Sequence, residues 1–318
     1  MDTKRYSRVI LAAIAVLFTS IWAGVNQAQE RPSNIPNPTI KVDVDLVLVN
    51  ATVSDLEGRM VTGLEQGNFQ VWEDKVEQKI EYFFGEDAPV SIGLIFDATG
   101  SMTDKISRAR DAAVTFLKAG NPQDEYFLIT FSERPRFIES FTTDISRLQN
   151  DVLFTGTKGL TPLFDAVYLG LEKMKSASNK RKALLLITDG EDNHSRYSFS
   201  EVKQFAREQD VQLFAIGILG PGGELTEGQP GRIIIEDLVG TASGEAFFPE
   251  SANELEDICS KIALELRNQY VLGYHSTNAV RDGRWRKIRL KVNPPTGATK
   301  LSVHSKGGYY AENANPKP

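Results

Sequence analysis

The middle of the chain alternates between short apolar runs and segments whose apolar residues have helical spacing. Val90 to Phe96 is an almost continuous apolar run, typical of a strand covered on both faces. From Lys105 to Ala119 the apolar residues recur every three or four positions, as on one face of a helix. The same criteria predict strands at Tyr126 to Phe131, Arg134 to Phe141, Ala183 to Ile187, Val211 to Ile218 and Ala246 to Phe248, and helices at Leu163 to Met174, Glu201 to Gln209 and Glu254 to Leu266. This alternation indicates an α/β domain, doubly wound around a mostly parallel sheet.

The segments on either side of this region have a different, two-residue period. Apolar and polar residues alternate through Thr39 to Phe84 and again from Tyr270 to His304, as in half-buried antiparallel strands. Neither flank is long enough to build a large core alone. We therefore predict one small β-sandwich, with the α/β domain inserted between its two segments. The expected division is a linker at 29–38, the N-terminal sandwich segment at 39–87, the α/β domain at 88–269, the C-terminal sandwich segment at 270–311 and a tail at 312–318.

The N-terminus has the layout of an export signal. Three basic residues precede the apolar segment Val9 to Gly24, and polar residues follow it. We expect residues 1–28 to act as a signal peptide or, if uncleaved, as an N-terminal membrane anchor. The expected location of the protein is periplasmic, envelope-associated or extracellular.

Three loops, far apart in the sequence, carry oxygen-bearing side chains next to these predicted elements. The first reads Asp-Ala-Thr-Gly-Ser over 97–101 and follows the apolar run at 90–96. The second reads Gly-Leu-Thr-Pro over 159–162 and opens a predicted helix, and the third reads Thr-Asp-Gly over 188–190 after another apolar run. Parallel sheets bind ligands beyond the carboxyl ends of their strands, so these loops are expected to meet. They offer two carboxylates and three hydroxyls, from Asp97, Asp189, Thr99, Ser101 and Thr161.

This set of donors suits a hard divalent cation. Carboxylate and hydroxyl oxygens favour Mg2+, with Mn2+ or Ca2+ as alternatives. Alone, an Asp-x-Thr-x-Ser motif is a weak signal, and it is the presence of all three loops in order that makes the prediction specific. A cation held largely by neutral hydroxyls keeps much of its charge, so it attracts a further acidic oxygen from a partner.

The three motifs resemble the von Willebrand factor type A domain and its metal-ion-dependent adhesion site. The first motif of that family is Asp-x-Ser-x-Ser, and here Thr99 stands where serine is usual, which retains the hydroxyl. By this resemblance Thr161 corresponds to the family's single threonine ligand and Asp189 to its second acidic residue. The similarity covers about residues 89–269, and the overall layout also resembles the von Willebrand-related proteins of Acidobacteria. The resemblance implies a module that binds a protein through its metal, without catalysis.

The predicted function is therefore an exported, metal-dependent, protein-binding module whose partner presents an Asp or Glu. No catalytic residue is predicted. The formal net charge of −6 and the lack of a basic stripe with aromatic residues argue against nucleic-acid binding. Membrane contact is expected only through the N-terminal segment, if that segment is not cleaved.

Two alternatives remain open from the sequence. Asp97 and its neighbours also resemble the start of a haloacid-dehalogenase-type phosphotransferase, in which the aspartate is the nucleophile. Such an enzyme needs a lysine and a downstream acidic pair, for which Lys158 or Lys182, and Asp189 with Asp192, are the candidates. The other alternative is a structural envelope or assembly protein that carries a vestigial metal site.

Overall fold

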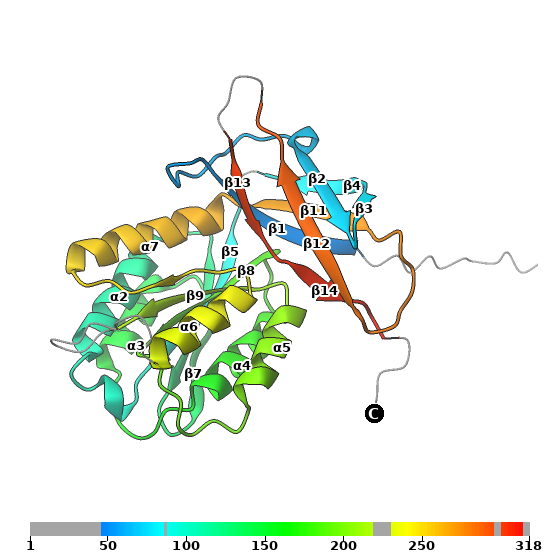
Figure 1. Cartoon of the computed structure of the whole chain (residues 1–318). Helices are drawn as coiled ribbons and strands as arrows, with labels where there is room; N and C mark the ends of the chain where they lie inside the picture. The colour runs from blue at the N-terminus through cyan, green and yellow to red at the C-terminus, as the bar shows by residue number, and fades with distance from the viewer. Residues whose placement is uncertain (1–45, 86–87, 219–229, 296–299, 314–318) are drawn as a thin grey trace, which may run out of the picture. The chain divides into compact units, whose positions relative to one another are not determined.

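The computed structural model describes residues 46–85, 88–218, 230–295 and 300–313 (Figure 1). The predicted signal or anchor at 1–28, the linker at 29–38 and most of the tail at 312–318 lie outside these residues. Within the described ranges, no helix is both long and apolar enough to cross a membrane.

A six-stranded sheet forms the centre of the α/β domain. Neighbouring strands are parallel throughout, except for the antiparallel pair at one edge, so the predicted mostly parallel sheet is confirmed. The strand order across the sheet is β10 (Ala246–Phe247), β9 (Gln212–Gly217), β8 (Arg181–Thr188), β5 (Val90–Asp97), β6 (Glu125–Phe131) and β7 (Pro135–Thr142).

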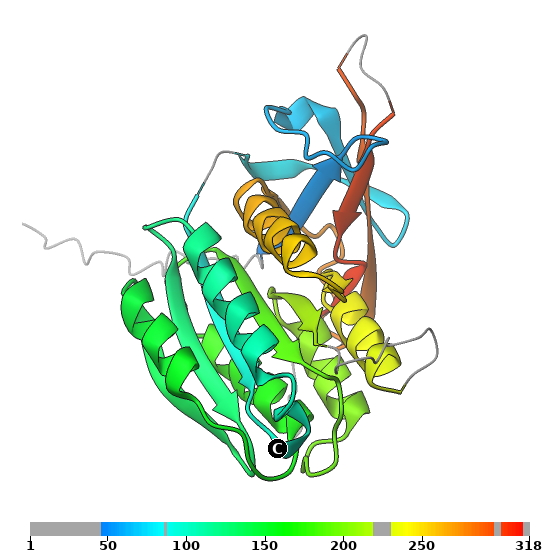
Figure 2. The same ribbon diagram turned by 90° about the vertical axis from the view of Figure 1, so that its left-hand side faces the viewer.

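Helices cover both faces of this sheet, as the doubly wound prediction requires (Figure 2). Alternate residues of β5 point to opposite faces, so Leu94 and Phe96 join one core cluster and Ile95 joins the other. The first cluster is covered by α2 (Ile106–Ala119), α3 (Ile145–Phe154) and α7 (Ala252–Arg267). The second is covered by α4 (Leu163–Met174), α5 (Phe199–Glu208) and α6 (Pro230–Thr241).

Two of these helices, α3 and α6, are absent from the sequence-based prediction. The signals for α3 are nevertheless present, because Leu148 and Val152 lie four positions apart on its buried face and the Asp144 carboxylate accepts a hydrogen bond from the Arg147 amide. Helix α6 buries Ile235 and Leu238 against the sheet. It begins at the end of the segment 220–231, whose Gly, Pro and Glu content indicates a surface loop, and of which residues up to 229 lie outside the described ranges.

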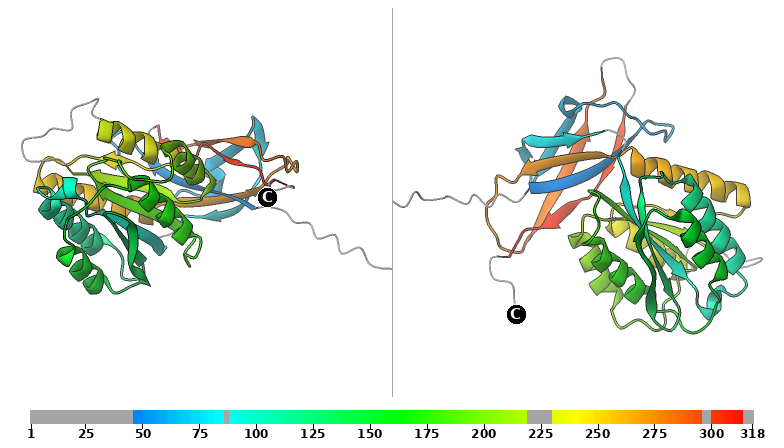
Figure 3. Two further views of the ribbon diagram at one scale, coloured as in Figure 1. Left: turned by 90° about the horizontal axis from the view of Figure 1, so that it is seen from below. Right: turned by 180° about the vertical axis from the view of Figure 1, so that it is seen from behind.

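The two flanks combine into two four-stranded antiparallel sheets (Figure 3). One has the order β13 (Ser302–Ser305), β1 (Leu46–Ser54), β11 (Tyr270–His275) and β4 (Ile80–Phe84). The other has the order β14 (Gly308–Tyr310), β12 (Trp285–Val292), β2 (Phe69–Glu73) and β3 (Val76–Gln78). Each sheet thus takes strands from both sides of the α/β domain, and both contribute to one core that includes Val49, Val71, Leu272 and Ile288. The residue boundaries given above for the individual domains stay a prediction.

A buried arginine lies where the chain passes between the β-sandwich and the α/β domain. Arg181, the first residue of β8, is 2% exposed. Its guanidinium donates hydrogen bonds to the carbonyl of Arg267 at the end of α7, to the carbonyl of Gln269 just before β11, and to the carbonyl of Ala88 just before β5. One side chain therefore contacts both chain crossings.

Helix α7 carries a buried carboxyl group, that of Glu265, which is 5% exposed. Burial, followed by the negative charge of Glu245, raises the pKa of Glu265 to about 7, while the Lys261 ammonium acts in the opposite direction. Because the ordinary pKa is 4.5, the unfolded chain ionises this group first as the pH rises. Ionisation in the unfolded state alone stabilises that state, so the folded protein loses stability between about pH 4.5 and 7.

This group gives a testable pH dependence. For each pH we compare the free energy of unfolding of Glu265→Gln with that of wild type. The variant minus wild-type difference is expected to be about 3 kcal/mol higher at pH 8 than at pH 4. Urea unfolding of both proteins at the two pH values, in chelator, measures this difference. A wild-type-to-variant difference that is the same at both values would show that Glu265 ionises normally in the folded state.

Candidate metal site

The three predicted loops meet at the carboxyl edge of the central sheet. Strands β5 and β8 are parallel neighbours, with Phe96 opposite Ile187, so Asp97 and Thr188 end their strands side by side. From β5 the chain crosses to β6 on one side, while β8 lies on the other. This is the topological switch point at which open α/β sheets bind ligands.

The first loop forms a continuous chain of hydrogen bonds. Asp97 is fully buried, and its Oδ1 accepts hydrogen bonds from the amide of Thr99 at 3.0 Å and from the Thr99 hydroxyl at 2.6 Å. The Thr99 Oγ1 lies 3.1 Å from the Oγ of Ser101, which lies in a short 3-10 turn of residues 100–102. The structure therefore brings Asp97, Thr99 and Ser101 together as the motif predicted.

Thr188 also lies in the loop cluster, although the sequence motifs did not predict a role for it. Its hydroxyl donates a 2.6 Å hydrogen bond to Oδ2 of Asp97 across the two strands, and its Oγ1 accepts from the amide of Gly190 at 3.1 Å. Together with Thr99, it fixes the orientation of the Asp97 carboxylate from both sides. The only sequence signal for this role is its place before Asp189 at the end of an apolar run.

The second loop is hydrogen-bonded to the first through its backbone. The amide of Gly100 donates to the Gly159 carbonyl at 3.1 Å, and the amide of Lys158 donates to the Ala98 carbonyl at 3.0 Å. Thr161, two residues further on, is 1% exposed, and its amide donates to Oδ1 of Asn193 at 2.8 Å. These contacts place Thr161 in the loop cluster, just before α4.

The third loop holds Asp189 through a close backbone approach. Gly190 has a φ of +82°, and a Cβ at this position would lie 2.4 Å from the carbonyl oxygen of Gly231 in the first turn of α6. Only glycine satisfies both demands. The Asp189 side chain is thereby held in a buried position, where its Oδ1 accepts a hydrogen bond from the Glu191 amide at 3.3 Å and its Oδ2 lies 2.8 Å from the Nζ of Lys105.

The electrostatics of the cluster fit a cation. Burial, followed by the negative charge of Asp189, raises the pKa of Asp97 to about 7, although hydrogen bonds from Thr188 and Thr99 act against the shift. A positive charge beside the two carboxylates would lower this pKa again. The available donors are all oxygens, which is what Mg2+ prefers. No group of three or more His, Cys, Asp and Glu side chains able to hold a metal occurs among the described residues, and the predicted ligand set contains only two carboxylates beside its three hydroxyls.

Two further acidic residues near the cluster, Asp192 and Asp165, accept hydrogen bonds from backbone amides. Oδ2 of Asp192 accepts a hydrogen bond from the Phe164 amide at the start of α4, at 3.1 Å. Oδ1 of Asp165 accepts from the amides of Arg196 and Tyr197, at 2.8 and 3.0 Å. These hydrogen bonds connect the segment after Asp189 to the beginning of α4. The carboxylates are favourably placed there because helix N-termini attract negative charge.

The geometry removes one candidate lysine of the phosphotransferase alternative. Lys182 lies opposite Ser91 at the beginning of β5, six residues before Asp97. Along a strand that separation is about 20 Å. Its ammonium donates to the carbonyl of Met174 at 3.1 Å. Lys182 therefore does not reach the Asp97 carboxylate.

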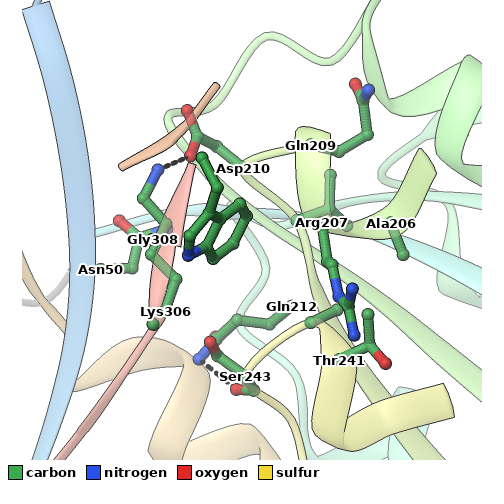
Figure 4. Close-up of a pocket in the computed structure, with 14 residues that line it drawn as sticks. Asn50, Ala206, Arg207, Gln209, Asp210, Gln212, Thr241, Ser243, Lys306 and Gly308 are labelled. Atoms are coloured by element: carbon green, nitrogen blue, oxygen red, sulfur yellow. Dashed lines mark hydrogen bonds and ion pairs between the residues drawn. The ribbon is translucent and has the colours of Figure 1, made fainter. Parts of the chain in front are cut away.

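A small pocket lies elsewhere, at the amino end of the central sheet (Figure 4). It measures about 40 Å³ and lies among residues of the end of α5, the start of β9 and the strands β12 and β14. Asp210 forms an ion pair with Lys306 at its wall, and Gln212 donates a hydrogen bond to the Ser243 carbonyl. It includes none of the predicted metal ligands, so the pocket and the loop cluster are separate features.

Comparison with known proteins identifies the family. Residues 91–261, more than half of the chain, match the von Willebrand factor type A domain, and the chain belongs to this family. Domains of this family are commonly protein–protein adhesion modules, are typically not enzymes and often bind a divalent metal.

Individual relatives are distant. The inter-alpha-trypsin inhibitor heavy chain 4 of mouse is 24% identical over 212 residues, covering 58% of this chain and 22% of the relative. The corresponding bovine protein is 22% identical over 216 residues, covering 63% and 23%. The chain thus spans less than a quarter of the length of these relatives. Among solved structures, a von Willebrand factor type A protein from Catenulispora acidiphila is 10% identical, with a TM-score of 0.49 over 86% of this chain and 74% of that one.

Proposed function

We propose that this chain is an exported, metal-dependent protein-binding module that recruits an acidic group of a partner protein. The proposal rests chiefly on one observation. Two buried carboxylates, those of Asp97 and Asp189, lie at the switch point of the sheet together with hydroxyl-bearing loops that are hydrogen-bonded to one another. Export is proposed from the signal-like residues 1–28, and a periplasmic, envelope-associated or extracellular location follows from it.

Each predicted ligand has a defined role in this proposal. The hydroxyl hydrogen of Thr99 points to Asp97, so one lone pair of Thr99 Oγ1 accepts from the Ser101 hydroxyl and the other is available to a cation. Thr188 and Thr99 hold the Asp97 carboxylate in one orientation, and Gly190 holds the backbone of Asp189. We assign Ser101 and Thr161 to the same shell. A bound Mg2+ supplies a positive centre that can accept a carboxylate oxygen from the Asp or Glu of a partner.

We propose that the site recruits its partner without catalysing a reaction. Both oxygens of Asp97 accept hydrogen bonds, which lowers its reactivity as a nucleophile. Lys182 is too distant to neutralise a phosphate there. Trapping of an aspartyl-phosphate would favour the enzyme alternative, and a chain that binds no metal would favour the purely structural one.

The test of the function is metal-dependent capture of a partner by wild type and by Thr161→Ala. The substitution removes one neutral ligand without changing the protein charge, and the amide contact from residue 161 to Asn193 is retained. We expect proteins of an envelope extract to be retained by the immobilised wild-type chain in Mg2+ and released by chelator. We expect Thr161→Ala to lose this retention.

Thr115→Ala is the matched control, since Thr115 lies in the second half of α2, away from the loops. It should retain the same proteins as wild type. If Thr161→Ala captures them as well as wild type does, in Mg2+ and in chelator alike, the partner is recognised by another surface.

A further inference from the structure

Lys105 places a positive charge inside the loop cluster. It lies at the N-terminal boundary of α2, four residues after Ser101, and its Nζ is 2.8 Å from Oδ2 of Asp189. The side chain of Asp189 is 3% exposed and that of Lys105 is 19% exposed. The ion pair joins residues 84 positions apart and is largely screened from water.

Lys105 is the only basic side chain within ion-pair distance of Asp97 or Asp189 in the described ranges of the chain. The other polar contacts of the two carboxylates come from neutral groups: the hydroxyls of Thr99 and Thr188 and the amides of Thr99 and Glu191. The ammonium thus supplies the positive charge that two neighbouring buried carboxylates require.

An ammonium and a divalent cation compete for the same carboxylate. Lysine carries three donors and no acceptor, so it offers no ligand atom to a metal and repels it by charge. The flexible four-carbon stem and partial exposure of Lys105 allow its ammonium to move away when Asp189 takes another cation. Oδ2 of Asp189 is therefore the atom at which the two compete.

We propose that Lys105 is the internal cation of the metal-free site: it holds Asp189 in place without metal and lowers the affinity of the site for divalent cations. This inference rests on the proposed metal-binding function and adds a residue that sets its strength. Metal binding is thereby an exchange of one cation for another.

Calorimetric titration of the full-length chain with Mn2+ at pH 7.5 tests this proposal. Lys105→Met is expected to bind Mn2+ about tenfold more tightly than wild type, which corresponds to about 1.4 kcal/mol. In chelator the same variant should melt at a lower temperature, because Asp189 has lost its charge partner. Lys105→Gln provides a second neutral variant, and Lys105→Arg, which keeps the charge, should bind close to wild type.

Lys118→Met is the matched control, since it makes the same change in net charge in the last turn of the same helix. It should bind Mn2+ as wild type does. If wild type binds Mn2+ and the neutral Lys105 variants bind it with equal or lower affinity, the proposed competition by Lys105 is wrong. The metal-site proposal is then unaffected. Equal tightening by Lys118→Met would also overturn it, as an effect of net charge. If no variant and no wild-type protein binds Mn2+, both proposals fall.

Discussion

Replacing Asp97 with Asn is expected to abolish the stabilisation of the chain by Mg2+ or Mn2+. A ligand that binds only the folded state adds about 2.7 kcal/mol to the free energy of unfolding at a hundredfold excess over Kd. Asn keeps the shape of the side chain but removes the negative charge at the centre of the hydrogen-bonded first loop. Melting curves with millimolar metal and with chelator measure the difference for both proteins.

The same variant should behave differently once metal is removed. Burial raises the pKa of Asp97 to about 7, so at pH 8 the metal-free wild type carries an ionised carboxylate that the fold disfavours. In chelator at pH 8 the Asn variant should therefore be at least as stable as wild type. This opposite effect with and without metal is what separates a ligand from a structural residue.

Asp192→Asn is the control for this experiment. The Asp192 carboxylate accepts a hydrogen bond from the Phe164 amide at the start of α4, outside the predicted shell. Its replacement should lower stability by a similar amount in metal and in chelator and leave the metal-induced shift in place. Identical wild-type melting curves in the two conditions would contradict the metal site itself.

Replacing Arg181 with Met is expected to lower the free energy of unfolding by about 3 kcal/mol or more. The change removes charged donors from the carbonyls of Arg267 and Gln269 and leaves those carbonyls without the guanidinium. Unsatisfied buried acceptors cost about 1–3 kcal/mol each. The guanidinium also lies 5.4 Å from the ring centre of Phe84, the last residue of β4, so an attractive contact with the β-sandwich is lost as well.

Because Arg181 contacts both chain crossings, its loss should also weaken the coupling of the β-sandwich to the α/β domain. Urea unfolding followed by two probes, tryptophan fluorescence and far-ultraviolet circular dichroism, should show transitions that no longer coincide. Lys182→Met is the neighbouring control, since among the described residues that ammonium donates a hydrogen bond only to the carbonyl of Met174, and its effect should be about 1 kcal/mol. An Arg181 variant as stable and as cooperative as wild type would show that the crossings are held by other contacts.

The fold was largely predictable from the spacing of apolar residues. The run at 90–96 became the fully buried β5, and the helix predicted at Leu163 to Met174 has the same bounds in the structure. These elements have strong local patterns and buried faces, which determine their type. The combination of both flanks into shared sheets was also predictable, because neither flank could cover its own apolar face.

The elements and contacts that escaped prediction depend on tertiary structure. Helix α3 is an exception, because the spacing of Leu148 and Val152 and the capping Asp144 are visible in the sequence. The hydrogen bond from Thr188 to Asp97 depends on the register of β5 and β8, and the ion pair of Lys105 with Asp189 depends on where α2 begins. Asp192 looked available for chemistry in the sequence, but in the structure its carboxylate accepts hydrogen bonds from the Phe164 amide and the Ser195 hydroxyl. The sequence motifs predict which side chains come together, whereas the strand register determines which hydrogen bonds orient them.

The most direct test of the metal-site proposal is the anomalous diffraction of crystals of this protein soaked in Mn2+. We expect one strong anomalous peak at the carboxyl edge of the central sheet, about 2 Å from ligand oxygens of the Asp97, Ser101 and Thr161 loops or from waters that they hold. Asp189 should lie in the same shell, and its ion pair with Lys105 should be broken. The absence of a peak at this edge under saturating Mn2+, or a peak only at another position, would contradict the proposed metal site.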